Sequence, residues 1–419
     1  DATDNNTTYT LTSAEVGKQI RGVVSYLDGY GTNEVVNSAA STTVANNLII
    51  RGNSLYTIVD GYYWAESEQQ SQKIGGNLLT VNNEEENNFV LSSLGASAVE
   101  YAKIRNQNYS KTNLHIGLND LDVEGNWVWS SGQKVEYSNW QVGEPGNGTE
   151  GNHAGILVNW WVPGKWHDLY DSYIRGDEAN IGIAETPFIR RGDSAYVIVQ
   201  GPTWEEAEAN AVKLGGHLVT INDATENEWL VQSFRNANKG YQPYPNDPDE
   251  VNNDVYWNGF NKRVQTDKWV WSSGESSSFT NWAVGRPGNF WGSTNEAVEM
   301  ILEAHPEVIT KFQNAEWVST AGNWSNAPAN ITRYGIAEIK LAPNNKPTGT
   351  PSITGTLKAG STLTIDASSI KDADNFTGYT PTFQYNWEVS SDNGTNWTKL
   401  TSTDATDNNN TYTLTSAEV

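Results

Sequence analysis

The side chains that could do chemistry in this chain are carboxylates and amides. Its 419 residues include 50 Asp and Glu against 26 Lys and Arg, a formal net charge of -24, with five His and no Cys. The lack of Cys excludes disulfides, thiolate metal sites and thiol catalysis. An acidic surface suits Ca²⁺ or an extracellular setting, and solubility alone would also account for it.

Catalysis, nucleic-acid binding and membrane insertion each lack their usual sequence signal. The chain has no GxSxG elbow, no phosphate-binding loop and no HExxH motif, and its histidines are scattered. We therefore predict that it is not an enzyme, with a glycan-processing enzyme as the distant alternative. No Lys/Arg run offers the basic stripe that nucleic acid requires. The longest apolar stretches, residues 156–158 and 160–162, are far too short for a transmembrane segment.

The elements that must position these side chains come from an internal duplication. Residues 75–78 (GGNL) match 215–218 (GGHL), residues 127–132 (WVWSSG) match 269–274, and residues 182–185 (GIAE) match 335–338. The matches occur in the same order in both copies. The offset between matching residues only increases along the chain, as insertions in the second copy would cause. We infer two homologous domains, a first copy over residues 47–187 and a second copy over residues 188–342.

Helix and strand signals recur in the same order within each copy. Thr203 followed by Glu206 is a capping box that opens a helix, and Gly215-Gly216 would end it. The next helix of each copy opens in the same way, at Asn83 with Glu86 and at Asp223 with Glu226. Short segments rich in Trp and Val with Ser-Gly turns follow and predict strands. Each copy is therefore expected to be an α+β domain.

In order and spacing, these motifs resemble a C-type-lectin-like domain. The first copy carries IGLNDLDVEGNWVWSSG, YSNWQVGEPGN, GKWHDL and IGIAE, and the second carries NGFNK, DKWVWSSG, FTNWAVGRPGN, GNWSN and YGIAE. The resemblance covers most of residues 54–187 and 194–341. It implies that the motif tryptophans pack the core; these are Trp127, Trp129, Trp269 and Trp271.

The resemblance also implies a Ca²⁺ site in the first copy. In this family a Glu-Pro-Asn loop, typically with a cis proline, joins an acidic pair and a Trp-Asn-Asp strand around the ion, and the same groups hydrogen-bond sugar hydroxyls. This chain has Gly146 inserted in the loop, His167 in place of the strand Asn, and Asn152-His153 at the acidic pair. The implied metal ligands are Glu144, Asn147, Asn152 and Asp168, with a neighbouring site at Asp120 and Glu124; Glu144, Asn147 and Asp168 would also bind the ligand.

The departures from the family pattern leave a second interpretation open. His153 and His167 would converge with Glu144 and Asp168, and two imidazoles with carboxylates suit Zn²⁺ or Ni²⁺ better than Ca²⁺. In the simplest interpretation, both histidines are surface residues of a loop that holds no metal.

The second copy departs further from the pattern. Arg286 stands where the loop Glu is expected, and Trp324-Ser325-Asn326 lacks the strand Asp. Sugar binding through Ca²⁺ is therefore not expected there. Glu296 and Glu299 are expected to face solvent or to pair with Arg286, and the long polar loops suit contacts with protein or with neighbouring copies.

The two ends of the chain repeat each other. Residues 1–16 (DATDNNTTYTLTSAEV) and residues 404–419 (DATDNNNTYTLTSAEV) differ only at Thr7 and Asn410. A match of this length indicates a repeat whose period is the distance from residue 1 to residue 404.

Joining the ends would complete an all-β domain. Short alternating segments between Asp, Asn and Gly turns predict a β-sandwich, with inward positions at Leu363, Ile365, Tyr385, Trp387 and Val389. The pattern resembles immunoglobulin-like repeats of bacterial, especially cyanobacterial, surface proteins. Residues 1–46 and 343–419 would be its two parts, completed either along one continuous polypeptide or by a strand donated between subunits.

Together these patterns predict an extracellular or cell-surface module for adhesion or ligand binding, with a carbohydrate and Ca²⁺ in the first copy. Its partners would be a glycan or protein at a surface and neighbouring copies of the same repeat. The alternative is a structural subunit of a surface layer or filament that assembles head to tail.

Overall fold

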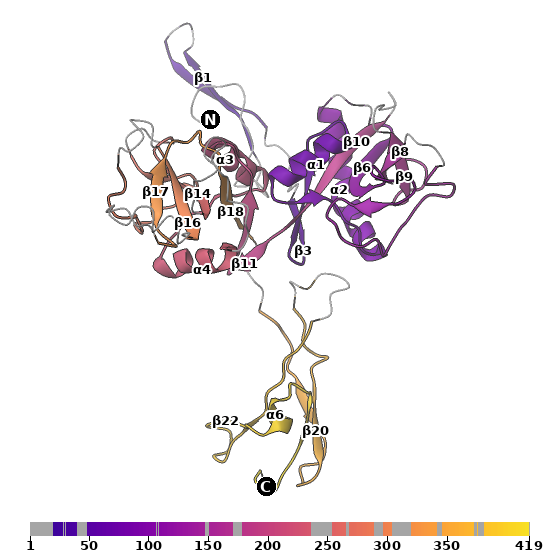
Figure 1. Ribbon diagram of the computed structural model, residues 1–419, viewed down its shortest axis with the longest axis vertical. Helices are drawn as coiled ribbons and strands as arrows, with labels where there is room; N and C mark the ends of the chain where they lie inside the picture. The colour runs from indigo at the N-terminus through magenta and orange to yellow at the C-terminus, as the bar shows by residue number, and fades with distance from the viewer. Residues whose placement is uncertain are drawn as a thin grey trace. The chain divides into compact units, whose positions relative to one another are not determined.

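A computed structural model describes residues 20–39 except 28 and 30, 48–146 except 106 and 108, 151–170, 178–235, 254–264, 268–288, 296–303, 320–341, 346–372, 375 and 381–418. The chain divides into two compact units, residues 1–341 and residues 342–419. Figure 1 draws the chain with its helices and strands labelled.

The first copy folds around a sheet whose main path has the order β3-β4-β10-β6-β8-β9. Its strands are β3 (Leu48–Arg51), β4 (Ser54–Val59), β5 (Asn77–Leu78), β6 (Thr112–Asn119), β7 (Val128–Trp129), β8 (Gly151–Leu157), β9 (Trp166–Tyr170) and β10 (Ala179–Pro187). Helices α1 (Trp64–Lys73) and α2 (Glu84–Ile104) accompany them. Strands β6 and β10 are parallel, whereas the other pairs of the main path are antiparallel.

The second copy repeats this topology with the main path β11-β12-β18-β14-β16-β17. Its strands are β11 (Ile189–Arg191), β12 (Ser194–Val199), β13 (His217–Leu218), β14 (Asp254–Asn261), β15 (Val270–Trp271), β16 (Ala297–Glu303), β17 (Trp324–Ala327) and β18 (Tyr334–Lys340). Helices α3 (Trp204–Lys213) and α4 (Ala224–Phe234) stand at the positions of α1 and α2. The mixed helix and strand content confirms the predicted α+β class.

The predicted helix starts are confirmed by their capping hydrogen bonds. Thr203 accepts from the Glu206 amide at 3.2 Å. The Asn83 and Asp223 side chains accept from the Glu86 and Glu226 amides at 2.9 Å and 2.8 Å. Each cap satisfies one of the donors that a helix start leaves open.

Large aromatic side chains fill the cores, as predicted for the motif tryptophans. Trp129 and Trp271 are buried, while Trp127 and Trp269 are partly buried and pack against the same clusters. Trp166 and Trp324, which begin β9 and β17, are fully buried. The strands that carry the motif residues are therefore anchored by their own first residue.

The remaining described segments are two small all-β pieces. A hairpin of β1 (Val23–Leu27) and β2 (Asn33–Asn37) precedes the first copy. Residues 342–419 contain the three-stranded sheet β19-β20-β23, the pair β21-β22 and helix α6 (Thr403–Thr406). The strands are β19 (Ser352–Thr354), β20 (Thr362–Asp366), β21 (Glu388–Val389), β22 (Thr398–Lys399) and β23 (Thr411–Thr413). The immunoglobulin-like assignment of these pieces stays a prediction.

Candidate functional site

The loop before β8 and strand β9 bring three ionisable side chains of the first copy together. The loop is fixed to β9 by the bridge between Trp140 and Trp166 and by the Gln141 amide, which donates to the Trp166 carbonyl at 2.8 Å. The peptide bond between Glu144 and Pro145 is cis, as the resemblance implied. Strand β9 supplies His167 and Asp168 directly after the buried Trp166.

Among the described residues, one cluster of three His, Asp or Glu side chains has the geometry to hold a metal ion. In this cluster, Glu144, His167 and Asp168 each offer a ligand atom within 4.8 Å of the others. His167 Nδ1 lies 2.9 Å from Glu144 Oε1 and 3.7 Å from Asp168 Oδ1. The Gly146 amide donates to Asp168 Oδ2 at 2.8 Å. The residue inserted into the family loop therefore helps to hold Asp168 in place.

Burial and a neighbouring carboxylate both perturb Glu144. Loss of solvent, followed by the hydrogen bond and the charge of Asp168, raises the pKa of Glu144 to about 7. The Gly146 amide opposes this effect only in part. Two carboxylates this close repel each other when both are ionised, so a bound cation would relieve the cluster of its excess negative charge.

Glycine is required next to the cluster because Asp168 occupies the space of a side chain. A Cβ atom at Gly151 would lie 2.7 Å from Asp168 Oδ2, and one at Gly146 would lie 3.3 Å from the same atom. Any larger residue at 151 would displace the Asp168 carboxylate.

Two adjacent tryptophans lie beside the cluster, and neither was among the predicted site residues. The Trp160 and Trp161 rings stack with centroids 5.2 Å apart and meet the His167 ring edge-on at 5.8 Å and 5.5 Å. Trp161 is 60% exposed and has a left-handed backbone φ of 52°. Two consecutive Trp residues shortly before the WHD strand are the signal that could have indicated an exposed aromatic surface, and they lie in the turn between β8 and β9.

The other predicted ligands of the first copy lie elsewhere or outside the described residues. Asn147 belongs to residues 147–150, which are not described. His153 is 1% exposed and stacks on Trp64 with ring centroids 4.5 Å apart, so it does not join the cluster. Asn152 is half-buried, and its carbonyl accepts from the Asp120 amide at 3.2 Å.

The predicted neighbouring site at Asp120 and Glu124 is only partly assembled. Asp120 is buried, and its Oδ2 accepts from the Gly125 amide at 2.8 Å. Its Oδ1 has no hydrogen-bond partner among the described residues. Glu124 is exposed. A buried carboxylate oxygen without a donor is the feature that a hard cation would complete.

Comparison with known proteins decides the family. The family described as "Lectin C-type domain" matches residues 60–175, which contain the whole Glu144 cluster. Lectin BRA-3 from Megabalanus rosa is 30% identical over 128 residues, which are 28% of this chain and 69% of that protein. The chain belongs to the C-type lectin family.

Other relatives are much longer than this chain. C-type mannose receptor 2 from Homo sapiens is 26% identical over 286 residues, which are 64% of this chain and 16% of the receptor. The secretory phospholipase A2 receptor from Oryctolagus cuniculus is 24% identical over 258 residues, which are 56% of this chain and 16% of that receptor. The chain therefore matches only a small part of either receptor.

Solved structures that match part of the chain include human lithostathine and the carbohydrate-recognition domain of cow CD23. Lithostathine is 21% identical with a TM-score of 0.26, covering 34% of this chain and 99% of that one. The CD23 domain is 25% identical with a TM-score of 0.26, covering 35% of this chain and 98% of that one.

The second copy keeps the cis-proline geometry of the first copy's loop with different charges. The peptide bond between Arg286 and Pro287 is cis, like that of Glu144 and Pro145. The strand register places Ser325 and Asn326 at the positions of His167 and Asp168. The Asn326 amide group bonds the Gly288 backbone through both of its polar atoms, at 3.0 Å each. A cation and an amide therefore stand where the first copy has two carboxylates.

Glu296 and Glu299 were predicted to face solvent or to pair with Arg286, and both form ion pairs with other arginines instead. Glu299 forms an ion pair with Arg333 at 3.1 Å, and Glu296 forms one with Arg263 at 2.9 Å. Because arginines already neutralise both carboxylates, each offers a metal ion less charge attraction than an unpaired carboxylate would.

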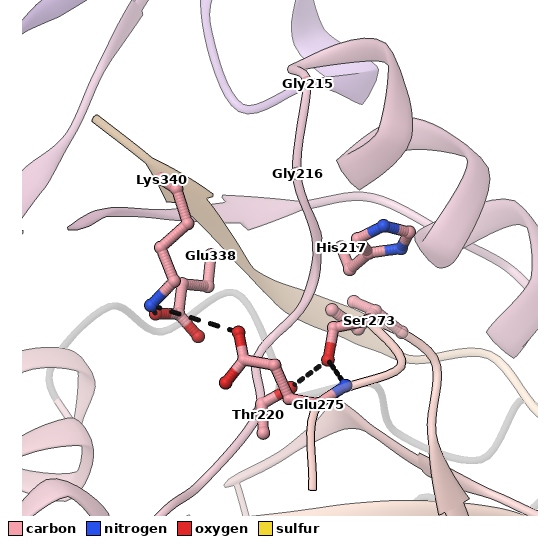
Figure 2. Close-up of a pocket in the computed structure, with 9 residues that line it drawn as sticks. Gly215, Gly216, His217, Thr220, Ser273, Glu275, Glu338 and Lys340 are labelled. Atoms are coloured by element: carbon pink, nitrogen blue, oxygen red, sulfur yellow. Dashed lines mark hydrogen bonds and ion pairs between the residues drawn. The ribbon is translucent and has the colours of Figure 1, made fainter. Parts of the chain in front are cut away.

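A separate cavity of about 290 Å³ lies beside β13 and β18 of the second copy (Figure 2). Lys340 Nζ lies 2.7 Å from Glu338 Oε1 and 4.0 Å from Glu275 Oε1. The Thr220 and Ser273 hydroxyls are 2.7 Å apart in the same wall. His217 also lines the cavity and bonds Glu208 at 2.7 Å, which raises the pKa of its imidazole.

The first copy has an uncharged residue at three of the four ionisable positions of this cavity. The strand register and the sequence match show which residues of the two copies are equivalent. Asn77 is equivalent to His217, Gln133 to Glu275, and Pro187 to Lys340. The two copies therefore differ in charge at two distant places, the cis-proline loop and this cavity.

Proposed function

We propose that the chain is an extracellular or cell-surface binding module whose first copy binds a carbohydrate through a divalent cation. The observation that carries this proposal is the convergence of Glu144, His167 and Asp168 within 4.8 Å, beside the exposed Trp161 ring. Relatives named as mannose receptors and as a lectin support a glycan as the ligand class.

The cation and the aromatic ring would hold different parts of a sugar. A bound Ca²⁺ accepts oxygen ligands beyond those of the protein, so a pair of sugar hydroxyls completes its coordination. The apolar C–H face of a pyranose ring packs against an exposed aromatic face, which is the environment that Trp161 offers. The two contacts together would fix both the position and the orientation of the sugar.

The donor set of the cluster fits a divalent cation, with Ca²⁺ as our choice. Glu144 and Asp168 supply hard carboxylate oxygens, and the unpartnered Asp120 oxygen supports a second cation nearby. The His167 imidazole is the one donor that favours Zn²⁺, and His167 instead positions Glu144 through the 2.9 Å contact. Asn147 remains a proposed ligand from the resemblance.

One substitution separates the two metals. His167→Asn restores the family residue, so it should keep or raise the Ca²⁺ affinity and should remove any Zn²⁺ affinity, as measured by titration calorimetry. Ser325→Asn makes the same change at the matching position of β17 and serves as the control, with no effect on either metal. Loss of Ca²⁺ binding in His167→Asn together with Zn²⁺ binding in the unsubstituted chain would exclude Ca²⁺ as the resident ion.

Sugar binding is tested on a glycan array with Ca²⁺ and with a chelator. We expect glycans to bind only with Ca²⁺, and Trp161→Ala to weaken them about tenfold while leaving Ca²⁺ affinity unchanged, because the ring contacts the sugar and not the ion. Absence of any bound glycan under both conditions would refute the carbohydrate proposal.

We propose, as a second function, that the chain is a structural repeat that assembles head to tail. The near-identity of residues 1–16 and 404–419 favours this role, because it indicates a unit that repeats along the sequence. Assembly and glycan binding are compatible, since they use different parts of the chain.

A further inference from the structure

The cavity beside β13 and β18 of the second copy contains a buried carboxylate with one unused oxygen. Glu338 lines the cavity and is 7% exposed. Its Oε1 atom accepts from Ser194 at 2.8 Å, from Tyr196 at 3.2 Å and from Lys340 at 2.7 Å. Its Oε2 atom receives no hydrogen bond from the described residues. Leaving a buried carboxylate oxygen without a donor costs free energy, which a bound donor would recover.

The first copy completes the equivalent carboxylate with its own backbone. Glu185 stands at the position of Glu338, and the Thr80 amide donates to its Oε2 atom at 3.3 Å. Thr220 is equivalent to Thr80, but its amide forms no hydrogen bond with Glu338. The second copy therefore leaves open an acceptor that the first copy satisfies.

The ionisable groups around the cavity carry more negative than positive charge. Lys340 Nζ lies 2.7 Å from Glu338 Oε1 and 4.0 Å from Glu275 Oε1, so one ammonium group serves two carboxylates. His217 Nδ1 lies 2.7 Å from Glu208 Oε1. That pair is neutral when the imidazole is protonated and negative when it is not, so it does not offset the excess. The charge balance favours a ligand with a positive charge.

Two hydroxyl groups in the cavity wall supply further acceptors. Thr220 Oγ1 and Ser273 Oγ are 2.7 Å apart, and Ser273 Oγ accepts from the Glu275 amide at 3.1 Å. A hydroxyl oxygen has two lone pairs, so Thr220 Oγ1 can still accept from a ligand. Apart from the His217 imidazole, the described residues that line the cavity include no ring on which a sugar could stack.

The cavity already holds one ammonium group, which belongs to Lys340. Figure 2 shows this group and the carboxylates of Glu338 and Glu275 pointing toward one another. The Lys340 side chain is 55% exposed, whereas that of Glu338 is 6% exposed. Lys340 can therefore turn into solvent when another cation arrives, and Glu338 cannot follow it. The volume of about 290 Å³ is close to the lower limit for small-molecule sites.

We propose that this cavity binds a small molecule that carries a primary ammonium group. The three N–H donors of the ammonium match three acceptors, the carboxylates of Glu338 and Glu275 and the hydroxyl of Thr220. The ligand replaces Lys340, which occupies the site in its absence. The inference goes beyond the proposed function, because it concerns the second copy and involves no divalent cation.

The test compares three ligands of similar size whose head groups differ in charge. Butylamine, 1-butanol and butyrate are each added to the full chain, and binding is detected by saturation-transfer NMR. A chelator keeps divalent cations away from the first copy. We expect butylamine to bind and the neutral and anionic compounds not to bind. Absence of butylamine binding, or equal binding of all three compounds, would overturn the proposal.

Two substitutions at the mouth of the cavity should change the affinity for butylamine in opposite directions. Glu275→Gln removes an attractive charge and should weaken binding about tenfold. Lys340→Met removes the competing ammonium group and should strengthen binding about tenfold. Both side chains are more than a third exposed, so the core of the copy stays intact.

A matched control accounts for the acidity of the whole chain. Glu228→Gln removes an exposed carboxylate from α4, outside the cavity, and should leave the affinity unchanged. Equal weakening by Glu275→Gln and Glu228→Gln would show that butylamine responds to net charge alone, and would overturn the proposed site. Weaker binding by Lys340→Met would contradict the replacement of Lys340 by the ligand. Near-ultraviolet circular dichroism verifies that each variant retains its packed tryptophans.

Discussion

The two copies share one topology and differ in the charges on their loops. In the first copy the Tyr56 hydroxyl donates to the buried Glu86 carboxylate at 2.7 Å, and in the second Tyr196 donates to Glu226 at 2.8 Å. An arginine pairs with the glutamate in both copies. The cis-proline loops, by contrast, carry Glu144 in one copy and Arg286 in the other. The buried polar network is thus part of the fold, whereas the loop charge is free to change the function.

A second pair of equivalent residues, Asp120 in the first copy and Lys262 in the second, also differs in the sign of its charge. The carbonyls of Asn152 and Glu296 accept from the amides of Asp120 and Lys262, which are therefore equivalent residues. The second copy has a cation at both positions where the first has a carboxylate. The comparison teaches that one scaffold carries carboxylates in one copy at two positions where the other copy carries Arg286 and Lys262.

The largest expected effect comes from transferring one residue of the second copy into the first. Glu144→Arg places a cation where we propose a metal ligand, and should weaken Ca²⁺ binding by about 100-fold or more, roughly 2.7 kcal/mol. Titration calorimetry measures the change. Arg286→Glu in the second copy should not create a site, because Ser325 and Asn326 remain. Strong Ca²⁺ binding by the Glu144→Arg variant would remove the site from this loop.

The pH dependence of cation binding should be the next largest effect. Burial and Asp168 raise the pKa of Glu144 to about 7, so the carboxyl is largely protonated below that pH and the cation must displace its proton. Ca²⁺ affinity should fall by about tenfold for each pH unit below 7 and level off above it. Calorimetry in buffers of different ionisation enthalpy would also detect the released proton. A flat affinity between about pH 5 and 7 would contradict this coupling.

A smaller difference is expected from removing the shared tyrosine hydroxyl. Burial and Glu86 raise the pKa of Glu185, which bonds Tyr56, whereas Lys340 neutralises the matching Glu338 in the second copy. Tyr56→Phe should therefore destabilise its copy by about 1 kcal/mol more than Tyr196→Phe. Hydrogen exchange reports the two copies separately and measures both losses. Equal losses would show that Lys340 contributes nothing to the network.

The smallest effect concerns His217, which stands where the first copy has Asn77. The hydrogen bond to Glu208 raises the pKa of His217, so its stabilisation is full below the unfolded pKa of about 6.5 and is lost as pH rises through the folded value. Its side chain is 37% exposed, which limits the contribution to a few tenths of a kcal/mol, about 0.3. His217→Asn should abolish this pH dependence in thermal unfolding, and Asn77→His should not alter the second copy.

Local signals in the sequence predicted the helix starts and part of the site. The caps at Asn83 and Asp223 depend on residues three positions apart, so the sequence contains the whole interaction. Glu144 and Asp168 could be found because each lies in a short motif that contains a tryptophan, the partly buried Trp140 and the buried Trp166. The caps could be predicted because their partners are fixed by spacing along the chain, whereas the role of Glu144 and Asp168 as metal ligands stays a prediction.

The position of His153 could not be predicted from spacing. The pairing of β8 with β9 is irregular between Gly151 and His153, and such a shift changes which face of the sheet a residue occupies. A one-residue irregularity is invisible in a pattern of alternating residues. His153 therefore stacks on Trp64 in the core, whereas His167 reaches Glu144.

Trp161 offers a consequence for how a ligand would be held. A non-glycine residue at φ 52° costs about 1 kcal/mol of backbone strain, and stacking on Trp160 limits the rotation of its ring. The ring is thus preorganised, and a sugar that settles on it orders little that was free before. Affinity gained in this way appears mainly as slower dissociation, so Trp161 should govern residence time more than the rate of capture.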